Sequence, residues 1–198
     1  MASDGEKIIM RHLRKVEDTS DGTGPCPIRH SWIVYPLLVG LTIAAFCSVV
    51  RNDFVVFDDS TSIINNPFVR QGLNPQSIRW AFTTTLTANW QPLTWLSHML
   101  DGQLFGLRPS AHHLMNLLLH ILNVLLLYTA LKKMTGAILP SAFTTALFAI
   151  HPLHVESVAW ASERKDVLCA LFWFLTLHAY IRYTRKRNPW NAILVLLP

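Results

Sequence analysis

Residues 113–131 read HLMNLLLHILNVLLLYTAL, and Lys132 and Lys133 follow at once. The run contains no Asp, Glu, Lys or Arg. A helix needs about 20 predominantly apolar residues to cross about 30 Å of hydrocarbon, and this run has close to that length. It therefore predicts a membrane-spanning helix with a positively charged flank.

The composition of the whole chain supports a membrane protein. Of its 198 residues, 51% are hydrophobic and only 15% are charged, whereas soluble domains carry about 25% charged residues. The apolar residues are grouped in long blocks, which distinguishes membrane spans from a soluble bundle. The other expected spans are 32–50, 136–150, 167–181 and an incomplete one at 190–198. We therefore predict an all-α, polytopic transmembrane helical bundle, and we interpret the chain as the N-terminal part of a longer protein.

The distribution of basic residues predicts the orientation of the spans. Basic residues follow the second and fourth spans, at Lys132, Lys133, Arg182, Arg185, Lys186 and Arg187. Lys and Arg in short connections favour the cytoplasmic side of the membrane. We therefore expect a cytoplasmic tail at 1–31, a transmembrane domain at 32–198, and exterior segments at 51–112 and 151–166.

The long exterior segment 51–112 is predicted to be ordered, because its apolar residues recur at helical spacing. Pro92, which suits the first turn of a helix, precedes leucines at 93, 96, 100 and 104. Helices that are apolar on one side and carry aromatic anchors lie along the membrane surface. We therefore expect interfacial helices here, anchored by Trp80, Trp90, Trp95 and Phe105.

Several function classes lack support in the sequence. The net charge is +5, but the basic residues lie beside apolar blocks, so we expect no nucleic-acid partner. The three cysteines form no CxxC pair, and no Gly-rich phosphate loop or HExxH motif is present. We therefore predict no metal site fixed by a motif, and the sequence leaves a role for a divalent metal open.

Two adjacent carboxylates, Asp58 and Asp59, lie shortly after the first span. Neighbouring carboxylates repel each other, which favours proton uptake by one of them and suits the pair to acid–base catalysis. Asp, Asn, Ser and Pro also favour turns, and all four residue types occur here. A solvated turn is therefore the alternative to a catalytic pair.

A second cluster of polar residues lies between the third and fourth spans. His151 and His154 are one helical turn apart, with Glu156 close behind and with Arg164 and Lys165 further on. Histidines and a carboxylate at such spacing can bind zinc, although the motif fixes no third His or Cys. The basic residues and histidines could instead bind a phosphate. An interfacial loop whose polar groups pair with one another and with lipid headgroups is the remaining alternative.

Polar residues also recur on one face of the second span, at His113, Asn116, His120 and Asn123. Polar side chains inside a bilayer commonly face protein or water. We therefore consider two roles for them. They either form a substrate pathway, for which Asn116 and His120 are the candidates, or hydrogen-bond neighbouring helices.

Six motifs occur in one order along the chain. They are FDD (57–59), NP (66–67), NWQPLTWLSH (89–98), NLLLH (116–120), HPLHVESVAW (151–160) and ERKD (163–166). Over roughly residues 50–185 this series resembles the membrane region of the transmembrane and tetratricopeptide-repeat (TPR) protein family. That family is similar to the C-type glycosyltransferases and includes protein O-mannosyltransferases of the endoplasmic reticulum as well as bacterial relatives.

The resemblance implies an integral-membrane glycosyltransferase with a polyprenyl-phosphate-linked sugar as donor and a protein or other hydroxyl compound as acceptor. It assigns the acidic motif to Asp58 and Asp59, and it leads us to expect that Arg164, Lys165, His151 and His154 stabilise the departing phosphate. The alternatives are a non-catalytic anchor that presents a TPR domain to partners, and a transporter. The expected location is the bacterial inner membrane, or the endoplasmic reticulum membrane in a eukaryote, and we expect this part alone to be inactive.

Overall fold

The computed structural model describes residues 31–185. Every regular element within this range is a helix, which confirms the all-α prediction. The predicted tail, except for its last residue, and the incomplete span at 190–198 lie outside the described residues.

Three helical segments are long and apolar enough to cross a membrane: Val34–Arg51, Pro109–Thr135 and Ala161–Arg185. The first comprises α2 (Val34–Phe46) and the 3-10 helix η2 (Cys47–Arg51), the second is α6 (Pro109–Thr135), and the third comprises η5 (Ala161–Glu163) and α9 (Arg164–Arg185). The chain is thus a multi-pass membrane protein. α6 is longer than the apolar run 113–131 that predicted it, because Pro109 begins the helix and a left-handed Gly136 ends it.

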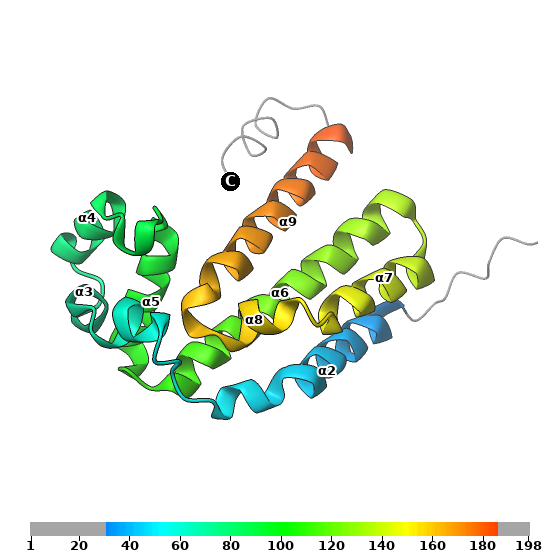
Figure 1. Ribbon diagram of the computed structural model, residues 1–198. Helices are drawn as coiled ribbons and strands as arrows, with labels where there is room; N and C mark the ends of the chain where they lie inside the picture. The colour runs from blue at the N-terminus through cyan, green and yellow to red at the C-terminus, as the bar shows by residue number, and fades with distance from the viewer. Residues whose placement is uncertain (1–30, 186–198) are drawn as a thin grey trace, which may run out of the picture. The chain divides into compact units, whose positions relative to one another are not determined.

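The expected third span corresponds to the shorter apolar helix α7 (Ile138–Ile150). At about 1.5 Å per residue it extends for about 20 Å, less than the hydrocarbon thickness. α6 lies at the centre and packs against α2, α7 and α9 (Figure 1). A buried cluster of Leu38, Val124, Tyr128 and Ala149 joins α2, α6 and α7.

Short helices precede α6 in the segment that the sequence predicts to be exterior, and Figure 1 labels α3, α4 and α5 among them. They are η3 (Ser60–Ile64), α3 (Pro67–Gln71), α4 (Pro75–Thr83) and α5 (Pro92–Phe105), with a short turn η4 (Leu86–Ala88) between the last two. Proline opens α3, α4 and α5, and asparagine side chains cap the first two of these helices. Their core is formed by Ile63, Val69, Ala81, Trp95, Met99 and Ala161.

The structure corrects one of the predicted membrane anchors. Trp95 is only 1% exposed in the core of the exterior helices, so it cannot contact lipid. Trp90 and Phe105 are 65% and 46% exposed, and the leucines at 93, 100 and 104 of α5 are also exposed. The face of α5 that the Leu spacing marks as apolar is therefore the outer face, and the buried face carries Trp95, His98, Met99 and Asp101.

Gly102 tests the close packing of α5 against α3. A Cβ atom at this position would lie 2.5 Å from the carbonyl oxygen of Val69. We expect Gly102→Ala to destabilise the protein by about 1–3 kcal/mol, because the two helices would have to separate. The measurement is the midpoint of thermal unfolding of the detergent-solubilised protein.

Gly40→Ala is the matched control, since a Cβ atom at Gly40 in α2 would meet nothing within 4 Å. Alanine favours a helix over glycine, so this variant should unfold at or above the wild-type temperature. Equal midpoints for the two variants would contradict the close α3–α5 contact.

Candidate functional site

Asp59 connects the segment after the first span to the start of the span Ala161–Arg185. It is fully buried, and its Oδ2 accepts the N–H of Val55 at 2.9 Å, which closes its own loop. Its Oδ1 accepts the N–H of Ser162 at 2.8 Å. The acidic motif is therefore held against η5, two residues before Arg164, although 103 residues separate Asp59 from Ser162 in the sequence.

Asp58 has a different environment. Its side chain is half-buried, and within residues 31–185 no hydrogen bond or ion pair to its carboxylate is present. The two neighbours thus divide into one carboxylate that is fixed by backbone donors and one whose oxygens are available.

Arg164, the first residue of α9, is a buried junction between three helices. All three of its side-chain nitrogens are engaged. Nε donates to Asn116 Oδ1 at 2.7 Å, Nη1 to Ser97 Oγ at 2.9 Å, and Nη2 to the His112 carbonyl at 2.9 Å. Nη1 also lies 2.5 Å from Asp101 Oδ2. A substrate phosphate, the partner that the sequence predicted, could reach this guanidinium only if one of these contacts opened.

Two histidines extend this junction. His98 Nδ1 lies 3.3 Å from His112 Nδ1, which in turn lies 3.4 Å from Asp101 Oδ2. All three side chains are fully buried. Burial lowers the pKa of His98 well below its usual value, with the charge of Arg164 adding to this effect. Burial also raises the pKa of Asp101, and Arg164 partly offsets that shift.

His98, Asp101 and His112 have the chemistry and the spacing of metal ligands. Ligands around a tetrahedral zinc ion lie about 3.3 Å apart, which matches the two distances above. However, the Asp101 carboxylate is already paired with the Arg164 guanidinium, and a divalent ion would lie beside that positive charge. The contacts therefore fit a hydrogen-bonded network better than a metal centre.

The predicted cluster between the third and fourth spans is only partly assembled. The rings of His151 and His154 lie 6.1 Å apart, and His154 lies 5.4 Å from the ring of His120 on α6. Burial lowers the pKa of His154, and His151 contributes to this shift. Glu156, on α8 (His154–Ala159), is exposed.

Lys165, the other predicted phosphate ligand, forms an ion pair of 2.7 Å with Glu163. Its side chain is 34% exposed. It is therefore more accessible than the neighbouring Arg164, which is fully buried.

The polar face of α6 forms helix contacts. Asn116 Nδ2 donates to the Trp160 carbonyl at 3.0 Å, and Asn123 Nδ2 donates to the Val167 carbonyl at 2.9 Å. His120 Nε2 lies 3.1 Å from the Ala149 carbonyl. These contacts fit the helix-packing alternative for Asn116 and His120, since both side chains are buried against protein.

The patterns in the sequence did not predict that Ser97, His98, Asp101 and His112 belong to this site. A signal was present, because His98 and Asp101 are three residues apart and so share one face of α5. The leucines of α5 predicted its apolar face, and no role was predicted for the residues on its polar face.

The chain is similar to several proteins that are named protein O-mannosyl-transferases. Mouse TMTC1 is 35% identical over 158 residues, which cover 74% of this chain and 16% of that protein. Human TMTC4 is 33% identical over 179 residues, which cover 79% and 24%. Human TMTC2 is 33% identical over 160 residues, which cover 75% and 18%. No protein-family model and no solved structure matches the chain. The chain thus spans only about a sixth to a quarter of the length of these relatives.

Arg164→Met tests the buried junction. We expect it to destabilise the protein by about 3–5 kcal/mol, because it leaves the Asp101 carboxylate buried without its cation. Lys165→Met, at the next residue, removes a partly exposed ion pair and should cost at most about 1 kcal/mol. Adding Asp101→Asn to Arg164→Met should recover part of the loss. Thermal unfolding of the wild type, these three variants and Asp101→Asn alone measures this, and additive effects of Arg164→Met and Asp101→Asn would contradict a direct pair.

His98 provides a pH test. Its pKa is lowered in the folded protein, so the unfolded chain takes up a proton below about pH 6.5 while the folded protein does not. Stability should therefore fall as the pH drops below that value, and His98→Gln should reduce this dependence. Arg164, Asp101 and His112 surround His98 in both proteins. Identical slopes of unfolding temperature against pH between 7.5 and about 5 would contradict the assignment.

Proposed function

Because the chain belongs to the transmembrane and tetratricopeptide-repeat protein family, we propose that it is the membrane region of a glycosyltransferase. The proposed reaction transfers a sugar, mannose by analogy with the names of the relatives, from a polyprenyl-phosphate donor to a hydroxyl group of a protein. The proposed reaction site is on the exterior face, where Asp58 and Asp59 lie in the predicted topology.

The observation that carries this proposal is the contact between Asp59 and the start of the last span. It supports a reaction centre where the acidic motif meets the segment that contains Arg164 and Lys165. An acid–base group and the cations that stabilise a leaving phosphate must lie within the length of one substrate. A turn exposed to solvent on all sides would not fix Asp59 to a residue so far along the chain.

The structure suggests different roles for the two carboxylates. We assign Asp58 as the general base, since its carboxylate has no partner within the described residues. Asp59 is a positioning residue, because both of its oxygens accept backbone N–H groups. Each hydrogen bond of a charged carboxylate to a backbone donor is worth about 1.5–3 kcal/mol, which is enough to order the loop that carries Asp58.

In the proposed step, the acceptor hydroxyl oxygen attacks the anomeric carbon of the sugar. The bond between that carbon and the phosphate oxygen breaks, and the polyprenyl phosphate leaves with the electron pair. Asp58 takes the hydroxyl proton. The negative charge on the departing phosphate requires a cation or hydrogen-bond donors. We retain Lys165 as the candidate cation and the His151–His154 pair as candidate donors, because Arg164 is fully engaged.

The roles are separable by substitution in the complete, membrane-embedded protein. Asp58→Asn should lower transfer from polyprenyl-phosphate mannose by about 100-fold or more at unchanged thermal stability, as expected for loss of a general base. Asp59→Asn should lower both transfer and stability, because an amide can accept at only one of the two positions. Asp53→Asn, an exposed residue of the same segment, is the control.

Two outcomes would change the proposal. If Asp58→Asn transfers the sugar at the wild-type rate and Asp59→Asn is stable but inactive, then Asp59 is the base and Asp58 is not. Wild-type transfer by both variants would remove catalysis from this motif and favour the anchor that presents a repeat domain to partners.

A further inference from the structure

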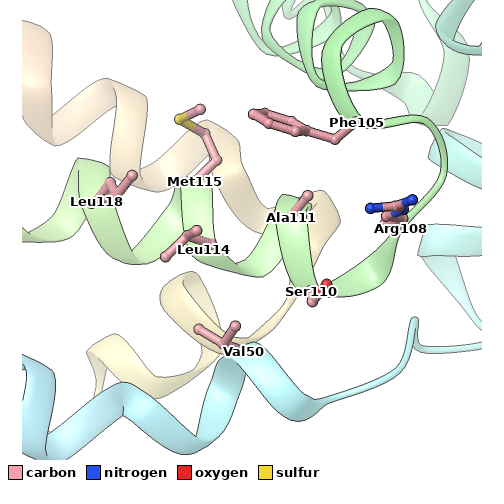
Figure 2. A pocket seen from close by; sticks show the side chains of 8 residues that line it. All are labelled: Val50, Phe105, Arg108, Ser110, Ala111, Leu114, Met115 and Leu118. Atoms are coloured by element: carbon pink, nitrogen blue, oxygen red, sulfur yellow. The ribbon is translucent and has the colours of Figure 1, made fainter.

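A groove lies along α6 on the side away from the candidate site, and we call it the Arg108 groove. Its volume is about 230 Å³, smaller than the roughly 300–1,000 Å³ of pockets that enclose a small-molecule ligand. Its wall is formed mainly by Val50, Phe105, Leu114, Met115 and Leu118, with Arg108 at one end. Figure 2 shows Arg108 and Leu118 at opposite ends of the groove, with Phe105 across from Met115.

The groove and the candidate site occupy opposite faces of α6. The groove uses Leu114, Met115 and Leu118, which recur at helical spacing on one face. The site uses Asn116 and His120, which are rotated by about half a turn from that face. The groove is therefore a separate feature, and an inference from it does not depend on the proposed catalysis.

Along the membrane normal, the groove runs from the headgroup layer to the lipid chains. The 27 residues of α6 extend for about 40 Å at about 1.5 Å per residue, whereas the hydrocarbon layer is about 30 Å thick. The ends of α6 thus reach the headgroup layer, and Arg108 directly precedes the first residue of the helix. Leu118 lies about 15 Å further along the axis, at the level of the lipid chains.

The exposed surface has the polarity that such a ligand requires. Leu114 and Leu118 are 43% and 49% exposed, and Phe105 is 46% exposed. Arg108 is exposed, and no carboxylate pairs with it among residues 31–185. An arginine at headgroup depth above a strip of half-exposed leucines is complementary to a phosphate that is joined to a hydrocarbon chain.

We propose that the Arg108 groove binds an anionic membrane phospholipid, with the phosphate on the Arg108 guanidinium and one acyl chain along Met115 and Leu118. The lipid fills the space between the end of α5, the start of α6 and η2. It holds the corner between α5 and α6 at the membrane surface, where the exposed Phe105 also lies.

The test places the complete protein in nanodiscs of phosphatidylcholine that contain a small fraction of phosphatidylglycerol with a photoreactive group on one acyl chain. After irradiation, mass spectrometry measures labelling of the peptide that contains Leu114 and Leu118. We expect Arg108→Gln to lower this labelling at least fivefold. Arg70→Gln, which removes an exposed arginine of α3, should leave it unchanged.

A second variant tests the groove without removing the arginine, because Arg108→Gln could lower the labelling through a loss of charge alone. Ala111→Phe obstructs the groove and retains Arg108, and it should also lower the labelling while the thermal unfolding midpoint stays that of the wild type. Full labelling in both variants would overturn the proposal. Displacement of the label by polyprenyl phosphate but not by unlabelled phosphatidylglycerol would also overturn it and assign the groove to the sugar donor. Crosslinking of a cysteine at position 114 to another part of the protein would show that protein covers the groove.

Discussion

One buried cation holds the described part of the chain together. The guanidinium of Arg164, the first residue of α9, has no contact with solvent, and its partners come from α5 and α6. A buried charge without partners costs several kcal/mol, so the folded state requires all three helices to be in place at once. The exterior helices are thereby fixed to the spans, and Ala161 at the start of η5 adds to this by packing in their core. Ser162 lies two residues away, so the position of Asp59 depends on the same junction.

The two faces of α6 differ in polarity and in their surroundings. Its polar face meets protein, where Asn116 and Asn123 donate to backbone carbonyls near the start of α9 and so set the register of the two helices. Its apolar face carries half-exposed leucines. Apolar packing between helices in a membrane gives little register information, because lipid tails satisfy leucine equally well. The amides therefore position α9, and α9 positions Arg164.

Local signals in the sequence predicted most of the fold. The apolar runs predicted the three long spans, and Pro92 predicted the start of α5. Helical spacing also identified which residues share a face, but it does not state which element that face meets. For this reason Trp95 was interpreted as a lipid anchor although it is a core residue, and the ion pair of Arg164 with Asp101 was not predicted. Both contacts join residues that are distant in sequence.

The roles that we propose for the two adjacent aspartates are different: Asp59 orders a loop, and Asp58 acts as the base. Each carboxylate oxygen of Asp59 accepts one backbone N–H, so a proton on either oxygen would weaken its own loop or the contact with Ser162. Asp58 has no such commitment in the described residues. A base must change its protonation state during each turnover, whereas a residue that orders a loop must keep its contacts. The two tasks are incompatible in a single carboxylate, which gives a physical reason for a pair in this position.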